Sequence, residues 1–209
     1  FRGLRALANL ALNTWLWHSD ETDEEALAAQ ALLPIYLARR GAIRAHVDAA
    51  GVPHIADAEE ARRERDLARR YQAYARGPFP VAPPRLVAVG GLSGTGKTTL
   101  AMALAPDLDP TPGAVVLRSD VLRKRLAGVA LDERMPAGWY TPQNSAAVYE
   151  ALHRLAGIAL AAGRSVILDA VYARPEEREA AQAVARDAGV AFAGIWLDAP
   201  TEALKRRVA

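Results

Sequence analysis

The sequence predicts an α/β protein, in which helices cover both faces of a parallel sheet and a small all-helical segment comes first. Three observations predict this fold. Residues 1–76 show helical periodicity only, whereas short β-branched runs alternate with amphipathic stretches from Arg85 onward. A glycine-rich segment, GLSGTGKTTL at residues 91–100, follows the first of these runs. Because strands separated by helices pair in parallel through right-handed crossovers, the second part should form three layers.

The first part is expected to be helical. A third apolar helix, ALLPIYLARRGAIRAHV, has Pro34 at a kink or in its first turn. The segment GPFPVAPP cannot continue a helix, so we expect a helical segment at 1–76, a Pro-rich linker at 77–84 and an α/β domain at 85–209. Two stretches with apolar residues on one helix face flank the third helix: Leu4, Leu7, Ala8, Ala11 and Trp15, and Leu67, Ala68, Tyr71, Tyr74 and Ala75.

The second part is expected to contain four strands and the helices that connect them. The expected strands read RLVAV, AVVLRS, SVILDA and AFAGIWL. The expected helices begin after Lys97, at DVLRKRL, at about Gln143 (ending near Ala162), at PEEREAAQAVARDAG and at TEALKRRVA.

Composition narrows the function classes. The 26 Lys and Arg residues stand against 24 Asp and Glu residues, which leaves a net charge of +2 and no large positive field. Charge alone therefore does not favour a nucleic-acid partner. The chain has no cysteine, which excludes disulfides and thiolate chemistry, and no apolar run near the roughly 20 residues that a membrane span needs. We expect a cytoplasmic protein without a membrane segment.

The glycine-rich segment matches the phosphate-loop pattern G-x-x-x-x-G-K-[ST] between a strand and a helix. Glycines allow positive φ, so successive amides can surround an anion at the helix N-terminus. The second part is thus predicted to be a P-loop NTPase domain that binds ATP and Mg²⁺. Lys97 would stabilise charge on the transferring phosphoryl group, and the Thr98 hydroxyl would bind Mg²⁺. The predicted nucleotide-binding residues are Gly91, Ser93, Gly94, Thr95, Gly96, Lys97, Thr98 and Thr99.

Two aspartates end predicted strands and should point into the same crevice as the loop. Each could hold Mg²⁺ through water or accept a proton from an attacking hydroxyl, and Asp120 could instead only cap the helix that follows it. Asp169 starts no helix at once, so capping explains it less well, and we expect it to support the metal. Arg123, one turn after Asp120, would hold an anionic or polyol substrate or would be an ordinary surface arginine. Asp198 is expected to serve a turn or a cap.

Two aromatic residues, Trp139 and Tyr140, precede the long helix. They would line a substrate pocket or, as is more frequent for aromatic residues, pack in the core. The four histidines have no ligand spacing, and we assign them no role.

At these residues the chain resembles the small P-loop kinases of the group that includes gluconate kinase, the zeta-toxin sugar kinases, chloramphenicol phosphotransferase and the polynucleotide 5′-kinase domain. The shared pattern is the phosphate loop, the second strand end at Ser119, Asp120 and Arg123, and the third strand end at Asp169. The resemblance covers about residues 85–209. It implies that Asp120 serves as base or as substrate ligand.

The whole chain, including RGLRALANLALNTWL and LLPIYLARRGAIRAHV, is similar to bacterial two-part proteins that join an aminoglycoside-phosphotransferase-like domain to a P-loop kinase domain. This implies that residues 1–76 are the last helices of the first domain, so no catalytic residue is carried over from it. It also implies that residues 85–209 are truncated before a fifth strand and an arginine-bearing lid. Either Arg206 and Arg207 supply part of the lid charge or the lid is missing.

Together these observations predict an ATP-dependent phosphotransferase, a P-loop kinase that transfers the γ-phosphoryl group of ATP to a hydroxyl of a small molecule. One alternative is a polynucleotide 5′-kinase-like enzyme, which would need a basic groove that the sequence does not show. The other is a nucleotide-binding regulatory module without transfer activity.

Overall fold

The computed structural model describes residues 4–18, 23–77 and 82–208. Its chain forms two compact units, one of residues 1–4 and 31–81 and the other of residues 5–30 and 82–209. The predicted boundary assigned residues 5–30 to the helical segment, whereas the structure groups them with the sheet. The reason is a set of hydrogen bonds to the sheet edge that is described below. Residues 78–81 of the predicted linker lie outside the described residues.

The first unit is a helical hairpin of α3 (Leu33–Gly51) and α4 (Ala58–Arg76), with the short 3₁₀ helix η2 (Val52–His54) after α3. Pro34 lies in the first turn of α3, one of the two positions expected for it. Asp57 caps α4, since its side chain accepts a hydrogen bond from the Glu60 amide at 2.7 Å. Gly41 permits close packing, because a Cβ there would lie 3.3 Å from the Tyr71 carbonyl oxygen.

The second unit contains a four-stranded parallel sheet in the order β2-β3-β1-β4. All four predicted strands are present in the structure. Val89 of β1 and Arg118 of β2 both pair with Asp169 of β3, so the carboxyl ends of the three strands lie side by side. The strands are β1 (Arg85–Gly91), β2 (Val115–Arg118), β3 (Val166–Asp169) and β4 (Ala191–Leu197).

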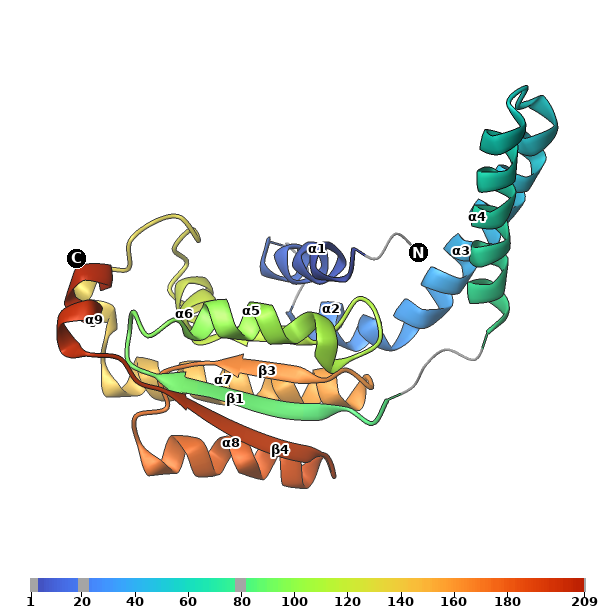
Figure 1. Ribbon diagram of the computed structural model, residues 1–209. Helices are drawn as coiled ribbons and strands as arrows, with labels where there is room; N and C mark the ends of the chain where they lie inside the picture. The colour runs from blue at the N-terminus through green and yellow to red at the C-terminus, as the bar shows by residue number, and fades with distance from the viewer. Residues whose placement is uncertain (1–3, 19–22, 78–81, 209) are drawn as a thin grey trace. The chain divides into compact units, whose positions relative to one another are not determined.

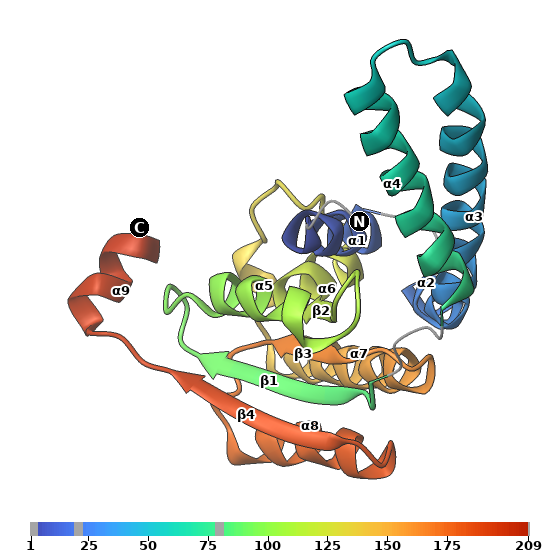
Figure 2. The ribbon, with the colours of Figure 1, turned by 45° about the vertical axis from the view of Figure 1, so that its right-hand side comes forward.

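Helices cover both faces of this sheet, as Figures 1 and 2 show, and the predicted three-layer α/β fold is confirmed. Alternate strand residues face opposite sides. Val87, Val89 and Ile167 pack in one buried cluster with α5, whereas Leu86 and Leu168 pack in another with α7 and α8. The helices are α5 (Lys97–Leu108), α6 (Ser119–Leu126), α7 (Pro142–Ala161), α8 (Pro175–Asp187) and α9 (Thr201–Val208), with the 3₁₀ helix η3 (Ala137–Trp139) before α7.

Two further helices belong to this unit: α1 (Arg5–His18) and α2 (Asp23–Ala28), which leads into η1 (Ala29–Leu32). Ala26 and Leu27 of α2 join the buried cluster that contains α7. The structure therefore contains helices on the sheet that the strand pattern after Arg85 did not predict.

Helix α1 binds the outer edge of β2, the strand at the end of the sheet. Asn13 accepts a hydrogen bond from the Val116 amide at 2.7 Å and donates to the Ala114 carbonyl at 3.2 Å. Asn9 donates to the same carbonyl at 2.9 Å, and the Trp17 indole donates to the Val116 carbonyl at 3.1 Å. These bonds satisfy strand groups that no neighbouring strand pairs.

None of the helices among residues 4–18, 23–77 and 82–208 has the length and the apolar character that a membrane span requires.

We expect Asn13→Ala to lower the free energy of unfolding by about 1–3 kcal/mol, because it leaves the buried Val116 amide without the acceptor that it has in the parent, whereas the Ala114 carbonyl keeps its bond from Asn9. The matched control is Thr14→Ala, an exposed position on the same helix, which should change stability by less than about 0.5 kcal/mol. Urea unfolding followed by circular dichroism measures both. Equal midpoints for the two variants would contradict the role of α1 as the edge cover.

Candidate functional site

The segment between β1 and α5 is a tight loop that depends on three glycines with positive φ. The angles are 141° at Gly91, 83° at Gly94 and 94° at Gly96, which is the N-cap of α5. At Gly91 an added Cβ would lie 2.5 Å from the Leu197 carbonyl oxygen and 2.9 Å from Thr95 Oγ1. Only glycine fits there, and the loop can therefore turn directly from the end of the strand into the helix.

The interior of the loop is held by hydrogen bonds to the Leu92 carbonyl. It accepts from Thr95 Oγ1 at 2.8 Å and from Lys97 Nζ at 2.9 Å. Burial lowers the pKa of the Lys97 ammonium, and the nearby Asp169 carboxylate opposes that shift. The Lys97 side chain thus reaches across the loop from the first turn of α5. A bound anion could take the place of the Leu92 carbonyl as the partner of its ammonium group.

The end of β3 meets the first turn of α5. Thr98 Oγ1 donates to Asp169 Oδ2 at 2.6 Å, and Arg118 Nε lies 3.6 Å from the same oxygen. The Asp169 side chain is only 6% exposed, so its charge is shielded from solvent. The two residues predicted to serve the metal, Thr98 and Asp169, are therefore in direct contact.

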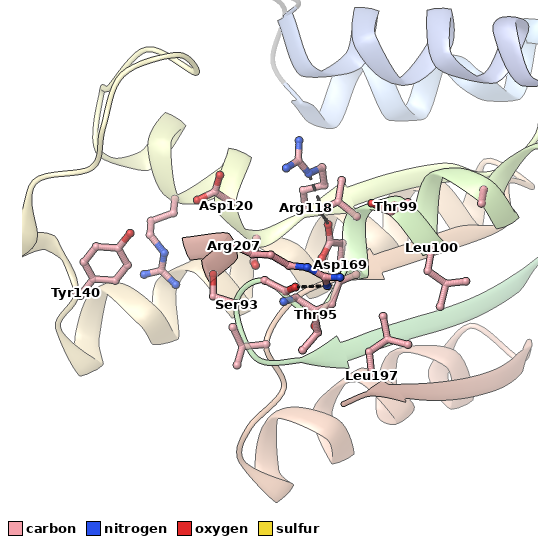
Figure 3. Close-up of a pocket in the computed structure, with 18 residues that line it drawn as sticks. Ser93, Thr95, Thr99, Leu100, Arg118, Asp120, Tyr140, Asp169, Leu197 and Arg207 are labelled. Atoms are coloured by element: carbon pink, nitrogen blue, oxygen red, sulfur yellow. Dashed lines mark hydrogen bonds and ion pairs between the residues drawn. The ribbon is translucent and has the colours of Figure 1, made fainter. Parts of the chain in front are cut away.

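A cleft of about 1080 Å³ opens in front of these groups, and Figure 3 shows the residues that line it. The loop lines it from Ser93 to Thr99, and Asp169, Arg118 and Asp120 line it from the strand ends and α6. Gly91 serves the turn itself. Every other residue that the sequence predicted for the site lies on the surface of this one cleft: Ser93, Gly94, Thr95, Gly96, Lys97, Thr98, Thr99, Asp120, Arg123 and Asp169.

Asp120 is the second residue of α6, and the N-cap position is occupied by Arg118. The interpretation of Asp120 as a helix cap is therefore wrong. Its side chain is exposed at the mouth of the cleft, as Figure 3 shows, where a hydroxyl-bearing molecule can reach it.

Arg123 and Tyr140 form a pair on the same side of the cleft. The Arg123 guanidinium carbon lies 5.2 Å from the centre of the Tyr140 ring, within the range of a cation–π contact. Arg123 Nη1 is buried and has no hydrogen-bond partner among the described residues. Of the two aromatic residues that precede α7, Tyr140 lines the cleft and Trp139 packs against the buried cluster.

Helix α9 contributes one arginine. Arg207 lines the cleft, and its Nη1 donates to the Gly94 carbonyl at 3.0 Å, whereas Arg206 is exposed. Asp198, between β4 and this helix, accepts a hydrogen bond from the amide of the next residue, Ala199, at 2.9 Å, and its service to a turn or a cap stays a prediction.

The segment that follows Asp169 contains Tyr172 and is hydrogen-bonded to Tyr149 of α7. Tyr172 has φ 53°, and its amide donates to Tyr149 Oη at 3.0 Å. Burial raises the pKa of Tyr149 to about 12 and raises that of Tyr172 further, so both remain neutral hydroxyls. The Val171 carbonyl accepts from the Gly91 amide at 3.0 Å, which ties this segment to the phosphate loop.

Sequence reasoning missed Arg118 and Val171, which also line the cleft. The signal for Arg118 was available, because it ends the strand that leads to Asp120. Trp17 carries no local signal. Its ring lies 5.1 Å from the Arg118 guanidinium carbon although 101 positions separate the two residues in the sequence.

The cleft brings together a glycine loop at the start of α5, an ammonium, and a hydroxyl beside a carboxylate, which are groups that phosphoryl transfer uses. No group of three or more His, Cys, Asp or Glu side chains that could hold a metal occurs among the described residues. Thr98 and Asp169 fit Mg²⁺, which takes one or two protein oxygens and completes its shell with phosphates and water.

Comparison with protein families and curated proteins finds relatives over the whole chain. A family model described as an AAA domain matches residues 86–209. The chain is 31% identical over 216 residues to Rv2004c and MT2060 of Mycobacterium tuberculosis and to Mb2027c of Mycobacterium bovis. These alignments cover 100% of this chain but 40% of each relative, so the chain spans less than half of their length.

Among solved structures, the APS kinase CysC of Mycobacterium tuberculosis in complex with AMPPNP and APS is 30% identical, with a TM-score of 0.48. That comparison covers 60% of this chain and 68% of the kinase. A Pnkp1/Rnl/Hen1 complex is 21% identical with a TM-score of 0.47, over 60% of this chain and 39% of that one.

We expect Gly91→Ala to destabilise the protein by at least about 2 kcal/mol, because the new Cβ would collide with the Leu197 carbonyl and φ is 141°. The matched control is Gly157→Ala in α7, where an added Cβ meets nothing and helix propensity should add up to about 1 kcal/mol. The midpoint of urea unfolding reports both changes. A Gly91→Ala variant as stable as the parent would show that the turn does not require glycine.

Proposed function

The chain belongs to the AAA domain family, and on that premise we propose that it is an ATP-dependent phosphotransferase that transfers the γ-phosphoryl group to a hydroxyl of a small molecule. The single observation that carries the proposal is the 2.6 Å contact between Thr98 Oγ1 and Asp169 Oδ2. It joins the phosphate loop to an acidic strand end inside a cleft that also exposes Asp120. Nucleotide and acceptor can therefore meet in one place.

In this proposal the phosphate loop binds ATP through its amides and through the N-terminus of α5. Lys97 leaves the Leu92 carbonyl and binds the terminal phosphates, where it offsets the charge of the transferring group. Thr98 and Asp169 hold Mg²⁺, which would neutralise the phosphate charge when bound.

Asp120 and Arg123 act on the acceptor. The Asp120 carboxylate, exposed at the mouth of the cleft, orients the acceptor hydroxyl and takes its proton as that oxygen attacks the γ-phosphorus. The bond from the γ-phosphorus to the bridging oxygen breaks, and ADP leaves. Arg123, which lines the cleft and contacts Tyr140, binds an anionic or polyol part of the acceptor.

The small-molecule acceptor is part of this proposal as well, because the chain spans less than half of the relatives that it matches. The resemblance of residues 1–76 to the end of an aminoglycoside-phosphotransferase-like domain stays a prediction. So does the cytoplasmic location. The boundaries 1–76, 77–84 and 85–209 stay a prediction of domain limits, although the contacts within this chain group residues 5–30 with the sheet.

The test of this function is transfer of ³²P from γ-labelled ATP to a panel of sugars, sugar acids, aminoglycosides, nucleosides and 5′-hydroxyl oligonucleotides in the presence of Mg²⁺. We expect a labelled small-molecule product. Label on an oligonucleotide would favour the polynucleotide kinase instead. Stabilisation by ATP with no acceptor-dependent release of ADP would favour the regulatory module.

With an acceptor in hand, Asp120→Asn should lower kcat by a hundredfold or more and leave ATP affinity nearly unchanged, because an amide cannot take the hydroxyl proton. The control is Asp198→Asn, which removes a carboxylate that does not line the cleft. Rates come from single-turnover transfer and affinity from calorimetry. Undiminished transfer by Asp120→Asn would exclude its role as the base.

Binding of ATP should be accompanied by proton uptake at alkaline pH. In the free protein, burial lowers the pKa of Lys97 from its ordinary value of 10.5. At alkaline pH a larger fraction of the Lys97 side chains is therefore neutral than for an exposed lysine. Phosphate charge raises that pKa, and the lysine takes up a proton on binding. Calorimetry near pH 9 in two buffers of different ionisation enthalpy measures the uptake. Lys97→Arg, which stays protonated, should abolish it; uptake that persists in this variant would assign the proton to another group.

A further inference from the structure

Helix α1 lies far from the phosphate loop in sequence, yet its last turn contacts the site. The Trp17 ring lies 5.1 Å from the Arg118 guanidinium carbon, and Arg118 Nε lies 3.6 Å from Asp169 Oδ2. Asp169 Oδ2 in turn accepts the hydrogen bond of Thr98. Figure 3 shows the Arg118 side chain between Asp169 and the helix drawn above the site. A continuous series of contacts therefore joins α1 to the residues proposed to hold Mg²⁺.

The position of Trp17 is determined by the pairing of α1 with β2. Asn9, Asn13 and Trp17 are four residues apart and lie on one face of the helix. They bind the backbone of Pro112, Ala114 and Val116, which are two residues apart along the edge of the strand. The next residue in that alternation is Arg118. The register that pairs the asparagines with the strand therefore also places the indole ring against Arg118.

The C-terminal end of α1 is held a second time, by α6. Arg125 donates to the Leu16 carbonyl at 2.9 Å and to the Trp17 carbonyl at 2.6 Å, and it forms an ion pair with Asp23. Helix α6 also carries Asp120 and Arg123. The Trp17 backbone is thus bound to α6, the helix that carries Asp120 and Arg123. Its ring contacts Arg118, the arginine beside Asp169.

We propose that Trp17 is a positioning residue of the phosphate site, whose indole face holds Arg118 so that Arg118 orients the Asp169 carboxylate toward Thr98. The inference rests on the proposed function only in that the site must bind Mg²⁺ and ATP. Transfer to an acceptor is not required.

The physical reason is the flexibility of arginine. Arg118 has a long side chain with many rotamers, its side chain is 25% exposed, and its Nε has no hydrogen-bond partner among the described residues. Stacking on an aromatic face selects one orientation of the guanidinium plane. Without the ring, Arg118 can turn into the cleft that it lines, and the Asp169 carboxylate loses the neighbour that orients it toward Thr98.

The indole also donates to the Val116 carbonyl, so a loss of Trp17 would affect stability as well as the site. Two variants separate these effects. Trp17→Phe keeps an aromatic face but loses the hydrogen bond, whereas Trp17→Leu loses both. Trp15→Leu is the matched control, because Trp15 is a tryptophan of the same helix whose side chain is exposed.

Affinity for Mg²⁺·ATP, measured by titration calorimetry on the full chain, is the readout, together with the Mg²⁺ concentration that gives half-maximal ATP binding. We expect Trp17→Leu to weaken nucleotide affinity about fivefold and to raise the Mg²⁺ requirement. Trp17→Phe should stay within about twofold of the parent, although both variants unfold at lower urea concentration. Trp15→Leu should match the parent in affinity.

A double-mutant cycle with Arg118→Gln tests whether Trp17 acts through Arg118. If it does, Trp17→Leu has no further effect on affinity once Arg118 is replaced. An unchanged affinity in Trp17→Leu, equal losses in Trp17→Leu and Trp17→Phe, or additive losses in the cycle would overturn the inference and leave the proposed function standing. Absence of Mg²⁺·ATP binding by the parent chain would overturn the proposed function and the inference with it.

Discussion

The parallel register at the carboxyl ends of β1, β2 and β3 is the constraint on which the rest of the site depends. Asp169 pairs with Val89 on one side and with Arg118 on the other, so the phosphate loop, the acidic strand end and the start of α6 emerge at the same edge. Helices on both faces then cover β1, β2 and β3, whereas most residues of β4 stay partly or fully exposed. A shift of one residue in the pairing would exchange the strand residues that pack against α5 with those that pack against α7 and α8, and it would separate Thr98 from Asp169.

The site combines a buried carboxylate, Asp169, with a backbone that has positive φ at several positions, a conformation that few residue types other than glycine adopt readily. The loop needs positive φ at its glycines, and Tyr172 adopts φ 53° where the chain leaves β3. Both features are held by contacts from outside the loop, namely the Leu197 strand end beside Gly91 and Tyr149 Oη beneath Tyr172. Strain of this kind persists where the surrounding structure over-determines it, and it is concentrated here around a cleft that can bind phosphate.

The outer edge of β2 is covered by side chains of α1 and not by another strand. β2 is an outer strand whose backbone groups would be left unpaired, and in this protein buried asparagines of a helix satisfy them. Asn9 and Asn13 are 0% exposed, which is unusual for amides and is explained by their bonds to the strand. The same helix brings an aromatic ring to the metal side of the cleft, so edge protection and site geometry share one element.

The sequence by itself determined the strands, their parallel pairing, the phosphate loop and the two aspartates, because periodicity, glycine conformation and the ends of strands are local properties. It could not assign residues 5–30 to the sheet or bring Trp17 to Arg118, and it left Tyr140 between a substrate pocket and the core. Bonds between a helix side chain and a strand edge about a hundred residues away leave no periodic signal in the chain. Only the tertiary structure decided those contacts, because they form when the free edge of β2 must find hydrogen-bond partners that no local segment supplies.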